Sequence, residues 1–510
     1  MKKPIAIVVA LIAILALCYL ALQKRGSNEF ADFNPNEELT LYCAAGIRKP
    51  ISKIIDQYSA ETGRKVNVIY NGSGALLSQI QLGKGDLYLP ANISYVREAQ
   101  NKNLASEFIP LAYLTAKIIV HKENTSIQSF EDLTKPGVRI SFADESAAIG
   151  KFTRKVLKAN GLFEKIEPNI TVTKPTVNNI IEDVSLGSAD ATIAWDAVAK
   201  NFPELRTIDV PAFNAKKREA CITLLNTSKN TSKALHLARY IAAKDKGLEI
   251  FKQSGFETVS TSDAWADVPE LLIFSGSMLK PAIGDRILEF EKREGCRIST
   301  VYEGCGTLVS QMEAGAKPSF YFSCDQTFLD RVQDRFSSGT TVTKNEIVLL
   351  VPKGNPKQLS SLEKLVSQKA KVGIAHPTKS ALGALTHQML DNANLLKALQ
   401  ESSNIVLLAS KGDELVTQMQ ANALDAALLY RSNAMATPSI MENCEIIALD
   451  RPDAVATQPY ATAIDTPYPR QLERLGNSSP TPMAKRTSLS MASHGKKSKR
   501  YRTHGHSIHA

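Results

Sequence analysis

The chain is poor in the residue patterns that carry metal or catalytic chemistry. It has seven cysteines in 510 residues, no C-x-x-C pair, and no Cys/His cluster with the spacing of a zinc site. No paired carboxylates, nucleophile–base spacing, phosphate loop or HExxH motif recurs along it. These absences predict a protein that is not an enzyme and that holds no metal and no cofactor.

An excess of one charge is also absent from most of the chain. The formal net charge is +10, but the stretch from Pro467 to Ala510 holds nine Lys or Arg against one Glu and supplies +8 of it. The remainder is close to neutral, so no nucleic-acid partner is expected. Residues 467–510 are rich in Ser, Thr, Pro, Lys and His, a composition typical of disorder, and we expect a basic disordered tail there.

There is one long apolar run at the N-terminus, from Pro4 to Leu22, with basic residues on both sides. At 1.5 Å per residue it nearly spans a bilayer core of about 30 Å. An uncleaved anchor, a cleaved signal and a signal lipidated at Cys18 all remain open, and each exports the rest of the chain. We expect residues 1–25 to be this anchor or signal and residues 26–37 a linker. The protein is then periplasmic or extracytoplasmic, tethered to the inner (cell) membrane by residues 4–22.

Six cysteines remain outside that run, and an oxidising compartment allows them to pair. Their pairing cannot be derived from the sequence. For Cys305, a packed thiol, a disulfide with Cys296 or Cys324, and a ligand contact all stay open.

The chain contains two copies of one unit. Lys49-Pro50 matches Lys280-Pro281 at an offset of 231, and Gly72-Ser73-Gly74 matches Gly304-Cys305-Gly306 at an offset of 232. Farther on, residues 189–195 match residues 424–430 at an offset of 235. A period this long excludes solenoids and propellers, whose units run to about 20–50 residues.

Each unit shows the strand–turn–helix alternation of a parallel sheet with helices on its faces. In the first copy, strands are expected at residues 39–43, 66–70 and 86–90, and helices at 50–62 and from 75 to 81. We therefore predict an α/β fold of two tandem units, each of two α/β lobes. The expected modules are residues 38–260 and 270–466, joined by a linker at 261–269. We expect the second to lack its closing helix, because residues after 466 do not match the helix expected at 232–253.

Small residues follow the first two strands of each copy and lead into helices. Helix N-termini present unpaired N–H groups and a partial positive charge, which suit an anion. Open α/β sheets bind ligands at this edge. No Arg, Lys or His recurs at matching positions beside both turns, so the pattern indicates a compact oxyanion held by neutral donors.

Three segments of the first copy carry a family resemblance: LYCAAGIRKPI, NGSGALLSQIQLGKGDLYLPA and ADATIAW. They resemble the molybdate/tungstate-binding proteins of ABC importers, which have the type II periplasmic binding-protein fold. The resemblance implies two tandem type II periplasmic-binding-protein-like units, each of two α/β lobes with a central mixed sheet and an interlobe cleft. In that family an A-A-S or A-G-S turn follows strand one, and an S-S or G-S-x-x-L-x-x-Q-I turn follows strand two. A later D-A-x-x-x-Y ends in a tyrosine that contacts the anion. The similarity covers nearly all of residues 38–260 and most of 270–466.

The resemblance implies ligand-binding positions in both copies. They are Gly46 and Ser277 for the first turn, Ser73, Gly74, Cys305 and Gly306 for the second, Trp195 and Tyr430 for the tyrosine, and Ala148, Val177, Ser380 and Gly412 for the second lobe. Each copy then lacks a donor that the family has. One unsatisfied oxyanion oxygen costs about 1–3 kcal/mol, or roughly ten- to a hundredfold in affinity.

The resemblance also implies a function and its partners. We expect a monomeric, exported solute-binding protein that captures molybdate or tungstate and delivers it to an ABC permease. A membrane-tethered sensor or scaffold, whose clefts bind another small ligand, is the alternative.

Overall fold

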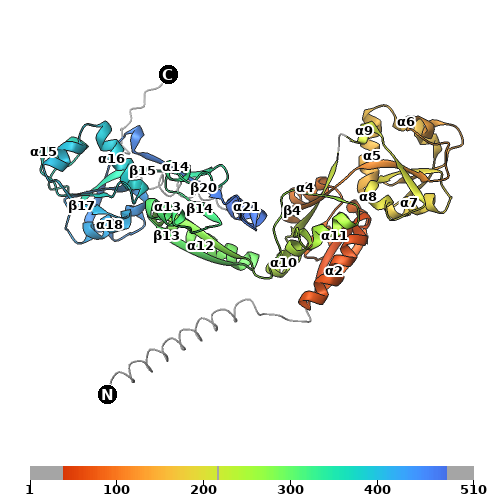
Figure 1. Cartoon of the computed structure of the whole chain (residues 1–510), viewed down its shortest axis with the longest axis horizontal. Helices are drawn as coiled ribbons and strands as arrows, with labels where there is room; N and C mark the ends of the chain where they lie inside the picture. Colours follow the sequence, from red (N-terminus) through yellow and green to blue (C-terminus); the bar gives the residue numbers. More distant parts are fainter. Residues whose placement is uncertain (1–37, 215–216, 479–510) are drawn as a thin grey trace, which may run out of the picture. The chain divides into compact units, whose positions relative to one another are not determined.

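The computed structural model describes residues 38–214 and 217–478. The chain forms two compact units, the first ending at Asp267 and the second beginning at Val268. Both units are α/β, and both contain two lobes, as the sequence predicts (Figure 1). The expected segments 1–25 and 26–37 lie outside the described residues.

The first lobe of the first module is built on a mixed sheet. Parallel pairing joins β1 to β2 and β3, and antiparallel pairing joins β10 to β3 and β4. The strand order is β11 (Glu257–Thr258), β4 (Ala105–Leu114), β10 (Arg218–Leu225), β3 (Leu87–Leu89), β1 (Glu38–Ala44) and β2 (Lys65–Asn71). The helices are η1 (Ala45–Ile47), α2 (Arg48–Thr62), α3 (Ser73–Leu82), α4 (Ile93–Asn101), α10 (Thr231–Ala242) and α11 (Gly247–Gln253).

The second lobe has a five-stranded sheet, which the chain enters directly from β4. Only Thr115 separates β4 from the first strand of this lobe. The strand order is β7 (Ile170–Lys174), β6 (Ile140–Ala143), β8 (Ala191–Trp195), β5 (Ala116–His121) and β9 (Leu205–Ile208). The helices are η2 (Glu131–Thr134), α5 (Ala148–Ala159), α6 (Phe163–Ile166), η3 (Glu167–Asn169), α7 (Val177–Ser185), α8 (Asp196–Ala199) and α9 (Pro211–Asn214).

The second module repeats this plan, but one long strand, β15 (Thr340–Pro352), runs through both lobes. Its first half pairs with β20 and its second half with β18 and β19. The strand order is β13 (Arg297–Glu303), β12 (Glu270–Gly276), β14 (Phe320–Phe322), β20 (Val455–Thr462), β15, β18 (Ala426–Tyr430), β16 (Val372–Ala375) and β17 (Ile405–Ala409), with β19 (Cys444–Ala448) on β15. The helices are η4 (Ser277–Leu279), α12 (Lys280–Glu294), α13 (Cys305–Glu313), α14 (Gln326–Asp330), α15 (Leu362–Ser367), α16 (Ala381–Asn392), α17 (Leu396–Glu401), α18 (Gly412–Gln420), α19 (Arg431–Met435), α20 (Ile440–Asn443), η5 (Pro452–Ala454) and α21 (Pro469–Ser478).

Helix α2 illustrates how local sequence builds a lobe. Its apolar residues recur at helical spacing and are buried: Ile51, Ile54, Ile55 and Tyr58. The helix ends at Gly63, whose φ of 70° is the left-handed conformation that glycine adopts without strain. The matching Gly295 after α12 has a φ of 61°, so both copies end this helix in the same way.

Strand register corrects one part of the predicted alignment between the copies. Glu38 pairs with Lys65, and Glu270 pairs with Arg297, which fixes an offset of 232 for this region. The predicted offset of 231 at Lys49-Pro50 is therefore wrong. Ser277 corresponds to Ala45, and Met278 corresponds to Gly46.

The C-terminal prediction is also wrong in part. Helix α21 occupies a place that was expected to be disordered, and it follows β20 as α10 follows β10. Leu472 and Leu475 are buried in the core of the second module. The second module therefore has a closing helix, one shorter than in the first. Two leucines at helical spacing are enough to dock it, although the composition of the surrounding segment is polar. Residues 479–510 lie outside the described part.

The segment 261–269, expected as a linker, packs onto the first module up to the unit boundary. The ring of Trp265 lies edge-on to His236 and Tyr240, at centroid distances of 4.9 and 4.8 Å. Asp267 accepts a hydrogen bond of 2.8 Å from Nε2 of His236. On the other side of the imidazole, the Tyr58 hydroxyl lies 3.0 Å from Nδ1.

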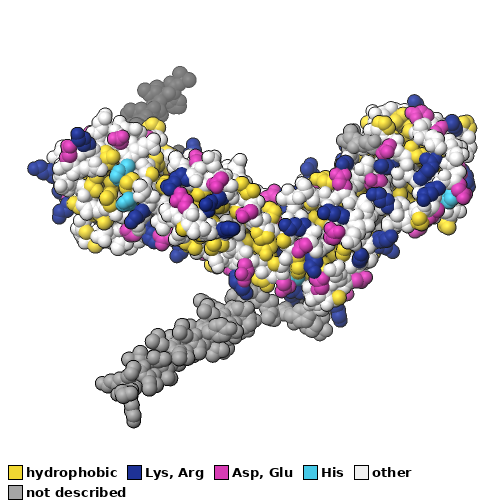
Figure 2. All heavy atoms as spheres, in the orientation of Figure 1, with side chains coloured by type: hydrophobic (Ala, Val, Ile, Leu, Met, Phe, Trp, Pro, Cys, Tyr) yellow, Lys and Arg dark blue, Asp and Glu magenta, His cyan; other side chains and the backbone are white. Residues whose placement is uncertain are grey.

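Charges are mixed on the surface of both modules. Figure 2 shows Lys and Arg side chains interspersed with Asp and Glu on the visible face. Within residues 38–214 and 217–478, no helix is both long and apolar enough to cross a membrane. The predicted apolar run at residues 4–22 lies outside these ranges.

His236 generates a prediction about stability. Burial lowers the pKa of His236 to about 4, against the hydrogen bond to Asp267, which favours protonation. Between that value and the ordinary histidine pKa of about 6.5, the unfolded chain binds a proton that the folded chain does not. The contribution of His236 to the free energy of unfolding, about 3 kcal/mol, is therefore fully present above pH 6.5 and is lost as the pH falls toward 4.

Thermal unfolding of the first module, followed by circular dichroism at pH 7 and pH 4.5, measures this loss. The His236→Asn variant should be less stable at pH 7 but should lose less on acidification than the wild type. His121→Asn, at a half-exposed site, is the control and should keep the wild-type pH slope. Equal slopes in His236→Asn and wild type would contradict the assignment.

Candidate functional site

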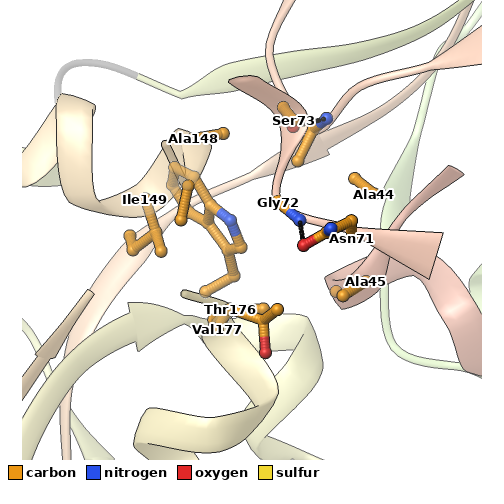
Figure 3. Close-up of a pocket in the computed structure, with 13 residues that line it drawn as sticks. Ala44, Ala45, Asn71, Gly72, Ser73, Ala148, Ile149, Thr176 and Val177 are labelled. Atoms are coloured by element: carbon orange, nitrogen blue, oxygen red, sulfur yellow. Dashed lines mark hydrogen bonds between the residues drawn. The ribbon is translucent and has the colours of Figure 1, made fainter. Parts of the chain in front are cut away.

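A small cavity lies between the two lobes of the first module. It contains about 240 Å³ of space, part of it open to solvent, and every residue that lines it is uncharged. The lining comes from both lobes (Figure 3). It consists of Ala44, Ala45, Gly46, Asn71, Gly72, Ser73, Ala91, Ala147, Ala148, Ile149, Thr176, Val177 and Trp195.

Helix N-termini supply most of this wall. The first residues of η1, α3, α5 and α7 all line the cavity, two from each lobe. The backbone N–H groups of a first helical turn have no partner within their own helix, and an α-helix carries roughly half a positive charge at this end. The cavity is therefore a place where a negative charge is stabilised without a cationic side chain.

Ser73 contributes the best-defined side-chain donor. Its Oγ accepts a hydrogen bond of 3.2 Å from the backbone N–H of Ala91, and its backbone oxygen accepts 2.6 Å from the Tyr88 hydroxyl. Since the Ala91 N–H already fills an acceptor position on Oγ, the hydroxyl proton remains for the cavity. The side chain is 1% exposed, so its orientation is held by packing.

The lobes touch at the N-terminus of α3. The backbone N–H of Gly74 donates to the carbonyl of Ser146 in the other lobe, at 2.7 Å. A Cβ on Gly74 would lie 2.9 Å from that oxygen, and a Cβ on Gly72 would lie 2.9 Å from the carbonyl of Pro175. Glycine at these two positions is what permits the close approach.

The second module closes in the same way. The backbone N–H of Gly306 donates to the carbonyl of Lys379 at 3.0 Å, across its own two lobes. Here the fit is tighter, because a Cβ on Gly306 would lie 1.9 Å from the carbonyl oxygen of Thr378. A Cβ on Gly304 would lie 2.8 Å from the carbonyl oxygen of Ser410. Both modules therefore adopt a closed form.

One wall of the first cavity is apolar. A Cβ on Gly46 would lie 2.8 Å from a methyl group of Val177 and 3.3 Å from one of Val198. A serine at position 46 would not fit unless those methyl groups moved. Trp195, 1% exposed, stacks on Phe152 at a centroid distance of 5.7 Å. The side chains of Val177 and Trp195 thus add an apolar patch to a wall whose backbone N–H groups come from both lobes.

The second module carries different side chains at the same places. Met278 stands at the position of Gly46, and Gly412 at the position of Val177, so the large and the small residue have changed sides. Tyr430 replaces Trp195 at the end of β18. Its hydroxyl is buried and has no hydrogen-bond partner among the described residues, and burial raises the pKa of Tyr430 well above its ordinary value. This hydroxyl is a donor without an acceptor.

Charged residues also enter the second cleft. Glu303 and Lys411 occupy the positions of Asn71 and Thr176, which line the first cavity. Their charged groups form an ion pair of 3.6 Å that joins the two lobes. In the first module, the Thr176 hydroxyl instead caps α7 by accepting the N–H of Asn179.

Most of the predicted site residues of the first copy lie together. Gly46, Ser73, Ala148, Val177 and Trp195 line the cavity, and Gly74 lies beside it at the lobe contact. Their binding of a ligand stays a prediction. In the second copy, Cys305, Gly306, Gly412 and Tyr430 match their predicted counterparts in register. Ser277 and Ser380 do not, because they correspond to Ala45 and Ala147 rather than to Gly46 and Ala148.

Sequence reasoning assigned no ligand-binding role to eight other residues of the wall, although some of them lie in the segments that carry the family resemblance. These include Ala44, Ala45, Asn71, Gly72, Ala91, Ala147, Ile149 and Thr176. The third strand of the first copy was predicted at residues 86–90, and Ala91 follows that range; Cys324 lies two residues after the matching strand β14. Its position at the carboxyl edge of the sheet could therefore have identified Ala91 as a residue of the cavity wall.

A closed two-lobed module with an uncharged cavity lined by helix N-termini defines a solute-binding protein. No group of three or more His, Cys, Asp or Glu that could hold a metal exists in the described part of the chain. The model of the bacterial extracellular solute-binding protein family matches residues 39–257 and 271–477. The chain belongs to this family and contains two copies of its domain.

Individual relatives match one copy each. A Haemophilus influenzae protein named as a binding protein is 29% identical over 222 residues, which is 43% of this chain and 90% of that one. The molybdate-binding protein ModA of Mycobacterium tuberculosis H37Rv is 27% identical over 232 residues, or 43% of this chain and 84% of the relative. ModA of Escherichia coli K12 is 27% identical over 114 residues, or 22% and 44%.

Solved structures match in the same way. The periplasmic molybdate-binding protein of Azotobacter vinelandii is 16% identical with a TM-score of 0.38, covering 43% of this chain and 98% of that one. The sulfate-binding protein SubI of Mycobacterium tuberculosis H37Rv is 16% identical with a TM-score of 0.38, covering 44% and 88%.

The lobe contact generates a second prediction. Gly306→Ala places a methyl group against a backbone carbonyl, so the second module should open, whereas Gly74→Ala should open the first module less. Hydrogen–deuterium exchange of peptides covering residues 304–308 and 376–380 should be faster in Gly306→Ala than in wild type.

Gly284→Ala is the matched control. It lies in α12, and the only atom within 4 Å of its added methyl group would be the Tyr302 hydroxyl, at 4.0 Å. Exchange in the two peptides should be unchanged in this variant. Wild-type protection in Gly306→Ala would show that the contact does not hold the lobes together.

Proposed function

We propose that the chain is an exported, membrane-tethered tandem receptor that captures a tetrahedral oxyanion, molybdate or tungstate, for an ABC importer. The observation that carries this proposal is the meeting of four helix N-termini at one uncharged cavity. The molybdate-binding relatives support the choice of ligand. The single-copy length of those relatives agrees with two receptors joined in one chain.

Cavity size supports a compact ligand. The space of about 240 Å³ includes solvent at its mouth, so the enclosed part of the cavity is smaller than this volume. A peptide or a sugar chain would not be enclosed. A small anion meets N–H groups on several sides, as a tetrahedral distribution of oxygen atoms requires.

Closure explains capture. The cavity wall comes from both lobes, so a ligand that contacts both favours the closed form over the open one. Hinge motion is then the step that traps the anion and presents a closed module to a permease. No reaction at the cleft is required, because release follows reopening.

The alternative is a tethered sensor or scaffold whose first cleft binds another small ligand. Its support is the apolar side chains of Val177 and Trp195 in the cavity wall, because Gly46 and Trp195 stand where the family resemblance implies hydroxyl donors. A ligand with an apolar end would suit that wall better than a symmetric oxyanion.

The two tryptophans of the chain provide a test specific to the first module. Both lie there, Trp195 in the cavity wall and Trp265 in the linker. In a Trp265→Phe background, the emission of Trp195 reports binding in the first cleft, and calorimetry on the same chain reports both clefts. Titrations with molybdate, tungstate, sulfate and phosphate should give binding by the first two and a change in emission.

Ser73→Ala should weaken the emission-detected binding roughly ten- to a hundredfold, because a buried donor is removed. Ser78→Ala is the control on the same helix, since its exposed hydroxyl only bonds the carbonyl of Gly74. Absence of binding for all four anions in both readouts would reject the oxyanion and leave the sensor or scaffold.

A further inference from the structure

Two thiols lie side by side in the cleft wall of the second module. Cys305 begins α13, and Cys324 follows β14 two residues after its end. A Cβ built on Gly276 would lie 1.9 Å from Sγ of Cys324 and 3.2 Å from Sγ of Cys305. The distance between the two sulfurs is therefore at most the sum of these two distances. Both cysteines are free in the structure.

The first module shows that this is a cavity position. Gly276, Cys305 and Cys324 correspond to Ala44, Ser73 and Ala91, which all line the first cavity. The backbone N–H of Cys324 donates to Sγ of Cys305 at 3.2 Å, just as that of Ala91 donates to Oγ of Ser73. Where the first module has Ala44 and Ala91, the second has Gly276 and Cys324. Because Gly276 has no methyl group, there is room for the thiol of Cys324.

Cys296 is not a partner for Cys305. It precedes β13, whereas Cys305 follows the other end of that strand. Seven extended residues separate the two ends by about 23 Å, far beyond the reach of a disulfide.

The surroundings divide the roles of the two sulfurs. Burial alone would raise the pKa of the Cys305 thiol, but hydrogen bonds from the thiol and backbone of Cys324 and from Tyr321 outweigh burial and lower it. The pKa of Cys324 is raised well above its ordinary value by its bond to Cys305 and by burial. Cys305, whose sulfur accepts the backbone N–H of Cys324, is thus the more acidic thiol of the pair and the one expected to react first.

We propose that Cys305 and Cys324 are a disulfide-forming pair, which makes the second module, but not the first, responsive to redox conditions. The oxidant is a disulfide compound. The Cys305 thiolate attacks one of its sulfurs, forming a mixed disulfide and releasing the first thiolate, which takes up a proton. Cys324 then loses its proton and attacks Sγ of Cys305, and the second thiol of the oxidant leaves. Two protein thiols are oxidised, and one disulfide is reduced to two thiols.

Reaction depends on opening of the cleft. Cys305 is fully buried and Cys324 is 5% exposed, and the loop that carries Lys379 packs against the first turn of α13. An oxidant reaches the sulfurs only when that contact opens. If the proposed function is right, an oxyanion that closes the second cleft should slow the oxidation. This second expectation depends on the proposed function, whereas formation of the disulfide does not.

The test uses the full chain with Cys18→Ser, so that the remaining six cysteines are the described ones. The chain is exposed to oxidised glutathione, trapped with an alkylating agent, digested without reduction and analysed by mass spectrometry. We expect a peptide that links residues 305 and 324, with the other four cysteines alkylated. The Cys305→Ser and Cys324→Ser variants should keep all of their remaining thiols. Cys444→Ser is the control and should form the same link as the parent.

Several outcomes would overturn the pair. One is glutathione attached to Cys305 without closure to Cys324, another is a link from either residue to a different cysteine, and a third is complete resistance to the oxidant in Gly306→Ala, whose cleft is opened. If the disulfide forms at the same rate with and without molybdate or tungstate, the pair stands and oxyanion binding in the second cleft is rejected.

Discussion

A backbone hydrogen-bond contact between the two lobes of each module organises the rest of the structure. The second N–H of α3 donates to a carbonyl of the opposite lobe, and α13 repeats this in the second module. Glycine at the donor position allows this approach, because a Cβ there would lie too close to the backbone of the opposite lobe, at Ser146 in the first module and at Thr378 and Lys379 in the second. The contact also decides where the remaining helix ends come to lie. Once the two lobes meet at this point, η1 and α3 from one lobe face α5 and α7 from the other, and the space between them is the cavity.

Much of this arrangement could be predicted from sequence, because turn chemistry and hydrophobic spacing are local. The strand–glycine turn–helix units around residues 72–74 and 304–306 were predicted at their observed places. The alignment of the first turn was wrong by one residue, because it was based on the Lys-Pro dipeptide that both copies contain. The strand before the turn pairs with the same register in both copies, and this register sets the correct alignment. Helix α21 was not predicted, because a short amphipathic helix within a polar segment contains few apolar residues and the composition of the segment indicated disorder. The helix expected at 232–253 is two helices, α10 and α11, broken between Ala242 and Gly247.

Tertiary complementarity was not accessible from one sequence. In the first module Gly46 lies against Val177 and Val198, whereas in the second module Met278 stands at the position of Gly46 and Asn433 fills the space beside Gly412. Interiors are close-packed, so a change on one side forces an opposite change on the other. The same logic links Gly276 to Cys324. The two copies therefore differ at pairs of neighbouring positions. Both modules still close, but the side chains that line their clefts differ.

The electrostatics of the clefts follow from the same divergence. In the first cavity, a bound anion can receive hydrogen bonds only from N–H groups and from the Ser73 hydroxyl. These donors are held in place by helices, so little free energy is needed to orient them around the anion. The second cleft adds Glu303, a carboxylate that would repel an anion if it stood alone. Its pairing with Lys411 cancels most of that field, but partly exposed ion pairs are screened by salt. The lobe contact of the second module thus includes an ionic component that the first module lacks at these positions, since Asn71 and Thr176 there are neutral. Two receptors with one closing geometry then differ in how closure responds to ionic strength, and this difference does not require any change in the shared fold.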